Sequence, residues 1–169
     1  MSTLKVGTIQ DHANSNTAIS IDSSGRLDYP AQPRFLAVLS SNTTVPQSHD
    51  IDWSTTAASW TEKFDVGGCF SNGLFTAPAA GVYHITYQMY CNPSGGNYMG
   101  AGMSGTAITD NYGVTNVWNF QAGGNDTGFS HSVLVDCSAA GKTITFGTYA
   151  AASSTARPDG TYIFGYKIG

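Results

Sequence analysis

Residues 73–87 constrain the fold of this chain more than any other stretch, because they predict a short strand, a sharp corner and a second strand. Pro78 fixes its own backbone and lacks an amide donor, so it suits a corner of a sheet rather than a central ladder. Gly81 permits a turn conformation that other residues resist. From Val82 onward, large apolar residues alternate with polar ones, as a half-buried strand requires.

Other short apolar runs follow from residue 34 to the end, separated by turn signals such as Asn72-Gly73. At 169 residues the chain has room for one such domain and a short extension. The pattern predicts an all-β, two-sheet sandwich over residues 34–169, with about eight strands in two packed sheets. The expected strands are residues 35–39, 73–77, 81–91, 98–108, 114–120, 128–135, 142–150 and 161–168.

Charge limits the partners of the protein. Only 11% of the residues are charged, and the net charge is −4 with no basic run, which argues against direct binding of nucleic acid. No apolar stretch has the ~20 residues that a membrane helix needs, and the N-terminus lacks the apolar region of a secretory signal. A surface with so few charges favours burial in an oligomer, although a monomeric β-protein remains the alternative.

The spacing Phe75-x-x-Pro78-x-x-Gly81-x-Tyr83 resembles the signature of the C1q/tumour-necrosis-factor-like jelly-roll domain. Gly165-Tyr166 is similar to that family's closing strand. The resemblance covers roughly residues 34–169 and implies a jelly roll that forms tight homotrimers and binds other molecules, not an enzyme. Trimer contacts are then expected from residues on the signature strand and the last strand, namely His84, Thr86, Ile163 and Lys167.

Residues 1–33 differ from the rest of the chain. Two short β-like pieces, residues 4–6 and 18–21, flank a polar stretch, and Pro30 and Pro33 predict an extended linker. Such a segment cannot bury enough surface to fold alone, so we expect a partner or the body to order it. We therefore treat residues 1–33 as an N-terminal anchoring arm.

The arm is similar to the N-termini of structural proteins of tailed phages, notably those of marine cyanobacteria. This likeness implies a virion protein made in the host cytoplasm and placed on the surface of the capsid or tail. The major capsid protein or another virion protein would then hold the arm. The residues expected to attach it are Leu4, Val6, Ile9, Ile19, Ile21 and Arg26.

Catalytic and metal-binding patterns are weak. The four histidines lack metal-ligand spacing, and the ten aspartates and one glutamate suggest no catalytic pair. Asp50 and Asp52 could hold calcium together with backbone carbonyls, but a solvated loop is the more ordinary interpretation. Three cysteines, without Cys-x-x-Cys spacing, predict buried free thiols. We expect no cofactor.

Three functions remain open from the sequence. The first is a trimeric capsid decoration, or cement, protein anchored by its arm. The second is a tail or head fibre, or its tip, that adheres to carbohydrate or protein on the host surface. The third is a hydrolase or lyase on a jelly-roll scaffold, which the missing catalytic constellation disfavours.

Overall fold

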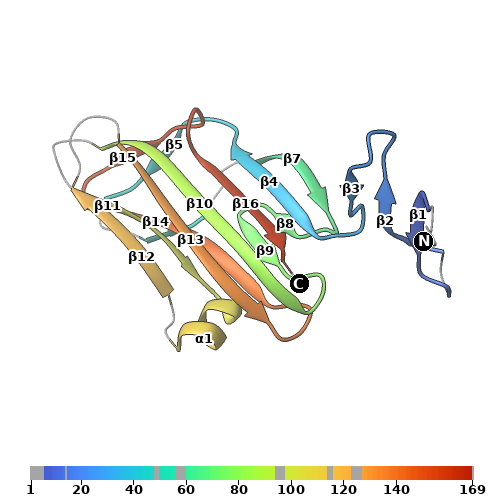
Figure 1. Ribbon diagram of the computed structural model, residues 1–169. Helices are drawn as coiled ribbons and strands as arrows, with labels where there is room; N and C mark the ends of the chain where they lie inside the picture. Colours follow the sequence, from blue (N-terminus) through green and yellow to red (C-terminus); the bar gives the residue numbers. More distant parts are fainter. Residues whose placement is uncertain are drawn as a thin grey trace.

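A computed structural model of the chain describes residues 6–13, 15–47, 50–55, 60–93, 98–113, 116–122 and 127–168. Over these residues the protein is an antiparallel β-sandwich with one short helix and a small separate sheet at the N-terminus (Figure 1). The predicted all-β jelly-roll sandwich is confirmed. None of the described helical residues form a segment long and apolar enough to cross a membrane.

One layer of the sandwich is a seven-stranded sheet of the described residues, in the order β5-β15-β10-β16-β4-β7, with β13 pairing along the other side of β10. Its strands are β4 (Arg34–Leu39), β5 (Thr43–Val45), β7 (Trp60–Val66), β10 (Gly81–Pro93), β13 (Thr127–Cys137), β15 (Ser154–Ala156) and β16 (Tyr162–Lys167).

The opposing layer is a sheet of six described strands in the order β12-β11-β14-β9-β8, with β6 also paired to β14. Its strands are β6 (Asp50–Asp52), β8 (Phe70–Ser71), β9 (Leu74–Thr76), β11 (Tyr98–Ser104), β12 (Asn116–Ala122) and β14 (Thr143–Ala150). The sheets therefore hold more strands than the eight expected. Most of the additional ones have two or three residues, too few to show a period of two.

One predicted strand is wrong in its second half. The strand expected over residues 98–108 ends at Ser104, and α1 (Thr106–Tyr112) follows. Gly105 separates them with a φ of 120°, and a Cβ there would lie 2.5 Å from the carbonyl oxygen of Thr143. This glycine conformation ends the strand, and the helix then buries Ala107 and Ile108.

The predicted corner is present. β9 ends at Thr76 and β10 begins at Gly81, which has a φ of 142°. The Tyr83 hydroxyl donates a hydrogen bond to the carbonyl oxygen of Ala79 at 2.8 Å, so the signature tyrosine holds the corner closed. Burial raises the pKa of this hydroxyl, which keeps it a neutral donor.

The core lies between the two sheets. Phe35 stacks on Phe70 with ring centroids 5.1 Å apart, and Tyr87 meets Phe146 edge-on at 5.6 Å. Inside this apolar layer the Trp53 indole NH donates to the Tyr87 hydroxyl at 2.7 Å and to Thr148 Oγ1 at 3.0 Å. The buried polar atoms of Trp53, Tyr87 and Thr148 are thus satisfied across the two sheets.

The described residues between 8 and 28 form a three-stranded meander that pairs with no described strand of either sandwich sheet: β1 (Thr8–Gln10), β2 (Thr17–Ile21) and β3 (Leu27–Asp28). In Figure 1 it stands apart from the sandwich, beyond the end at which β4 begins. The expected arm is thus more structured than two β-like pieces, because Asp22–Arg26 forms a turn that returns the chain to β2. Leu4 lies outside the described residues.

All three cysteines are free and buried. Burial, and then the charge of Asp65, raise the pKa of the Cys69 thiol to about 12. Burial, and then the charge of Asp136, raise the pKa of Cys137 to about 11. Since the thiolate is the nucleophile, we expect Cys69 and Cys137 to react slowly in the folded protein at neutral pH.

We predict that a thiol reagent at pH 8 labels none of the three cysteines in the folded protein and all three in denaturant without reduction. The reason is burial together with the raised pKa of Cys69 and Cys137. Mass spectrometry after labelling measures the count. Two sites that label only after reduction would contradict free thiols.

We also predict that Gly165→Ala destabilises the sandwich by about 1–3 kcal/mol in urea unfolding. A Cβ at Gly165 would lie 2.7 Å from Phe35 Cε1 and would also collide with the end of Ile85. Gly128→Ala is the control on β13, another strand of the same sheet, because its Cβ would meet nothing closer than 3.7 Å. Equal stability of the two variants would contradict this prediction, because it would show that Phe35 and Ile85 can move aside for the added methyl group.

Candidate functional site

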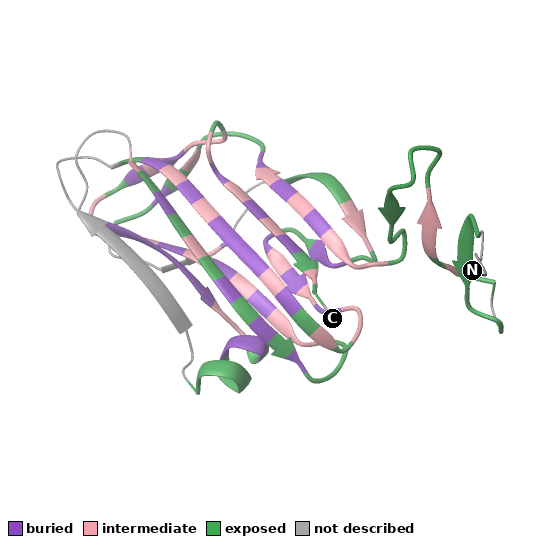
Figure 2. Cartoon of the chain, viewed as in Figure 1, coloured by how far each residue is buried: buried purple, intermediate pink, exposed green. Residues whose placement is uncertain are grey.

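The outer face of the seven-stranded sheet is the candidate site. Along β10 the side chains of Tyr83, Ile85, Tyr87 and Met89 are fully buried between the sheets, so the alternate residues point outward. Figure 2 shows this alternation as stripes along β10 and its neighbours. The predicted division of β10 into two faces is confirmed.

Strand register brings apolar residues from several strands together on this outer face. His84 on β10 lies opposite Leu134 on β13 and Tyr166 on β16. In the next row, Phe164 on β16 lies opposite Leu36 on β4, which in turn lies opposite Phe64 on β7. We call this set the association face: Leu36, Phe64, Val82, His84, Leu134, Phe164 and Tyr166.

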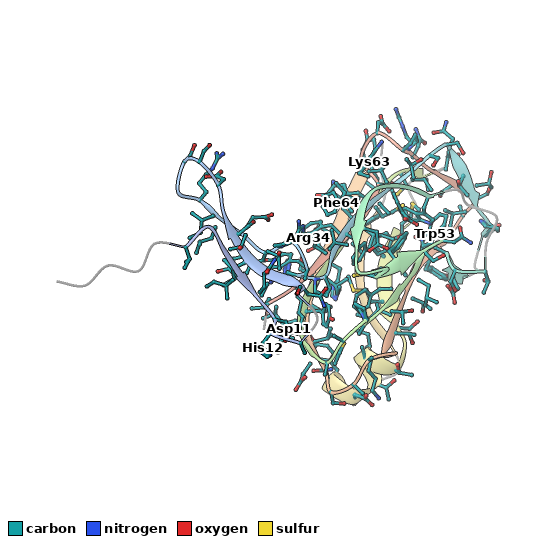
Figure 3. The ribbon with its side chains drawn as sticks, turned by 90° about the vertical axis from the view of Figure 1, so that its right-hand side faces the viewer. Asp11, His12, Arg34, Trp53, Lys63 and Phe64 are labelled. Atoms are coloured by element: carbon teal, nitrogen blue, oxygen red, sulfur yellow. The ribbon has the colours of Figure 1, made fainter. Side chains whose placement is uncertain are left out.

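Solvent reaches most of the association face. Leu134 is 56% exposed, Phe64 46% and Tyr166 44%. An apolar pocket of about 360 Å³ lies between β4, β7 and β16, lined in part by Arg34, Phe64 and Tyr166. Figure 3 labels Arg34 and Phe64 on this part of the sandwich. A contiguous apolar patch of this kind marks a surface that binds another molecule.

His84 is the polar residue within the association face. Its ring lies 5.2 Å from the Tyr166 ring and 6.0 Å from the Phe164 ring, and its Nδ1 is buried without a hydrogen-bond partner. A buried polar atom without a partner is costly, so a molecule that covers this face gains by supplying one.

The outer face becomes polar toward the other end of β10. Thr86 Oγ1 and Ser132 Oγ are 2.7 Å apart, and the Tyr162 hydroxyl donates to Gln88 Oε1 at 2.7 Å. These groups already satisfy one another. The apolar half, which is the half nearer the arm, therefore has more to gain from being covered.

The expected trimer contacts lie in two places. His84 and Thr86 both point outward, and His84 is part of the association face. The prediction is wrong for Ile163, whose side chain is fully buried between the sheets. Lys167 lies four residues after Ile163 on β16, so its side chain points to the same side of the sheet as Ile163 and away from the association face. Its backbone amide donates a hydrogen bond to Pro33, and its carbonyl oxygen accepts one from the Gln32 side chain.

Sequence reasoning missed Leu134 and Phe64. In β13 the outward positions before Leu134 are Ser130 and Ser132. An apolar leucine that follows two serines at alternate positions was the feature of the sequence that could have indicated an apolar outer surface. Phe64 lies within a run of charged residues in β7, which hid the strand and its apolar side chain.

The acidic residues proposed for calcium have another role where the structure describes them. Asp52 Oδ1 accepts hydrogen bonds from the Ser54 amide at 2.9 Å and from the Ser54 hydroxyl at 2.7 Å, which closes a turn. The side chain of Asp50 lies outside the described residues. Among the side chains that are described, no group of three or more His, Cys, Asp or Glu is placed to hold a metal ion.

The other histidine of the sandwich is half-buried. His131 lies on β13 opposite Tyr87, with Nε2 buried and without a partner. Burial lowers its pKa, so the ring stays neutral at pH 7. No acid or nucleophile accompanies it in the described contacts, and a packing role follows.

The predicted arm residues that are described lie in and beside the small sheet. Ile9, Ile19 and Ile21 belong to β1 and β2, and Val6 precedes β1. Arg26 lies in the turn before β3 and forms an exposed ion pair with Asp22 at 2.7 Å. Hydrogen bonds from the amide and the guanidinium of Arg26 lower the pKa of Asp22.

No family model matches the sequence, and neither does any curated protein. Solved structures do match. Murine APRIL shares 14% identity with a TM-score of 0.59, covering 81% of this chain and 99% of that one. The globular domain of zebrafish complement 1qA shares 15% with a TM-score of 0.57, covering 81% and 98%.

Eiger TNF from S. frugiperda, a third similar structure, shares 15% identity with a TM-score of 0.60 and covers 82% of this chain and 94% of that one. At these identities the likeness concerns the fold alone. The chain therefore has a TNF/C1q-like jelly-roll fold.

Proposed function

We propose that this protein is a non-enzymatic, homotrimeric decoration protein of a phage virion, seated on the capsid surface by its N-terminal arm. The association face carries the proposal, because it is a broad apolar surface that the described residues of one chain leave open. The simplest partner that could bury this face is another copy of the chain. A head-to-tail contact between copies can close as a ring, and a ring of three copies is the oligomeric state that TNF/C1q-like domains commonly adopt.

The non-enzymatic assignment is supported by the chemistry of the described side chains. The thiols are buried with the pKa of Cys69 and Cys137 raised, and His131 has no described acid or base beside it. Asp52 is engaged in a turn. A jelly roll in which these thiols are buried and this carboxylate is engaged in a turn is suited to holding other molecules rather than transforming them.

The virion assignment is supported by the likeness of the arm to the leaders of tailed-phage structural proteins and by the build of the arm. Val6, Ile9 and Leu27 are apolar and exposed there, at 40%, 50% and 57%. Exposed aliphatic residues on a small sheet favour a state in which the arm packs against another chain.

One observation favours adhesion to host carbohydrate as the second candidate. At the end of β10 that lies away from the arm, a hollow of about 410 Å³ is lined by Asn42, Asn92, Thr155, Arg157 and Asp159, among others. Amide, hydroxyl and carboxylate groups of this kind hydrogen-bond sugars. Specific glycan binding that Asn42→Ala weakens would favour a fibre-tip or head-fibre role.

We predict that Leu134→Asp converts the trimer into monomers. Burying a leucine contributes about 1.5–3 kcal/mol, and a trimer loses that contribution at each of its contacts. Leu134 is 56% exposed in the single chain, so the change leaves the core intact. Light scattering at micromolar concentration gives the mass, and circular dichroism verifies the fold.

Ser71→Asp is the control for Leu134→Asp, since it adds the same charge at an exposed position of the other sheet. It should remain trimeric. A wild-type protein that is monomeric at micromolar concentration, or a Leu134→Asp variant that stays trimeric, would contradict the assignment of this face.

We predict that deleting residues 2–28 leaves a folded trimer that no longer joins particles. The deleted segment pairs only with itself in the described sheets, so the sandwich keeps all its strands. Particles that lack the protein are mixed with full-length or truncated chain, and occupancy is measured on purified particles. Full occupancy by the truncated chain would place the anchor in the sandwich.

A further inference from the structure

The arm sheet has one wholly aliphatic face. Ile9 on β1 lies opposite Ile19 on β2, and Ile21 lies opposite Leu27 on β3. Ile19 and Ile21 are two residues apart on the central strand, so they point to the same side. These four side chains, Ile9, Ile19, Ile21 and Leu27, therefore form one patch, which we call the arm face.

The rest of the described chain leaves the arm face uncovered. Ile9 is 50% exposed and Leu27 57%. No described residue of the arm is buried, and Figure 2 shows its strands in green and pink without purple. Three strands with a hydrophobic face are the minimum for a sheet that is stable in water, so packing this face against another surface would stabilise the arm.

The contact between arm and sandwich falls elsewhere. Ala18, at the bulge of β2, lines a hollow of about 600 Å³ with Tyr29, Pro33 and Ile168. Arg34 donates to the Tyr29 carbonyl oxygen at 2.9 Å, and the Lys167 amide donates to Pro33. These links hold the linker at the end of the sandwich without covering the arm face.

The charges of the arm indicate what can cover it. Asp28 lies opposite Ser20, which lies opposite Thr8, so these polar residues share the other face of the sheet. Asp22 and Arg26 pair with each other in their turn. The arm face itself carries no charge, so it cannot form ion pairs with a charged partner. A second aliphatic surface is the partner that suits it.

In the proposed trimer, the position of the linker brings the arm of a neighbouring copy close enough to provide that second aliphatic surface. Residues 29–33 join the arm to the start of β4, beside the end of β16, and both strands carry the association face. Copies that associate through this face hold their arms at the same end of the assembly, at a high effective concentration. The arm faces of neighbouring copies are then aliphatic surfaces of the same kind that lie within reach of one another.

We propose that the three arms of the trimer pack their arm faces against one another around the three-fold axis. This inference rests on the proposed trimer and specifies how its arms are ordered. It reassigns Ile9, Ile19 and Ile21 from the virion contact expected from the sequence to the contact between arms. The polar face and the edge of β1 that no described strand pairs with are left to contact the virion protein.

A cross-linking experiment on the full-length chain tests the contact. Ile19→Cys places a thiol on the arm face, and Ser20→Cys places one on the opposite face of the same strand. The three natural cysteines are buried and free, so they do not interfere. After mild oxidation, Ile19→Cys should give a covalent dimer on a non-reducing gel, linking two of every three chains, while Ser20→Cys stays monomeric.

Amide hydrogen exchange gives a second measurement of the contact between arms that does not depend on forming a disulfide. Residues 8–28 should exchange at least tenfold faster in Ile9→Asp than in wild type, because a charge on the arm face separates the arms. Thr8→Asp adds the same charge on the other face and should exchange as wild type does. Both variants should remain trimeric, since the association face is unchanged.

Light scattering on each sample separates this inference from the proposed function. A trimer in which Ile19→Cys fails to cross-link, or cross-links no better than Ser20→Cys, overturns the arm contact and leaves the trimer standing. A dimeric mass with Ile19→Cys cross-linking overturns both the trimer and the three-fold packing of the arms, and leaves only a pairwise contact between arm faces. A monomer overturns both.

Discussion

The pairing of β10 is the constraint on which the rest of the structure depends. This strand of 13 residues pairs with β13 along one side and with β16 and β15 along the other. Its inward residues are fully buried, so slipping the register by one residue would exchange the core and the outer face. The corner at residues 77–80, closed by the Tyr83 hydroxyl, sets where this register begins.

Once that register is set, both faces of the sheet are determined together. The inward side meets the six-stranded sheet through aromatic rings and the hydrogen bonds of Trp53, Tyr87 and Thr148. The outward side places Leu134, His84 and Tyr166 in one row, although they lie far apart in the sequence. The apolar outer face and the aliphatic arm face lie toward the same end of the molecule, so one assembly of copies can bury both.

Sequence reasoning was most successful where a strand was long and strictly alternating. β10 and β16 lie within a residue or two of where they were expected, and the expected alternation of β10 is present. It was wrong at Gly105, where a positive φ replaces the end of a strand with a helix, and at Ile163, which is buried. It also missed β7, whose charged residues suit an exposed edge strand and conceal its apolar ones.

The sequence by itself determined the class of fold, the two faces of the central strand and the different character of residues 1–33, because these depend on local periodicity and on turn-forming residues. Only the tertiary structure decided which strands lie side by side, and therefore that Leu134, Phe64 and Tyr166 share one surface. The four arm residues likewise became one face only when β1 and β3 paired with β2. The physical reason is that a period of two assigns a residue to one side of its own strand, whereas pairing between distant strands determines its neighbours.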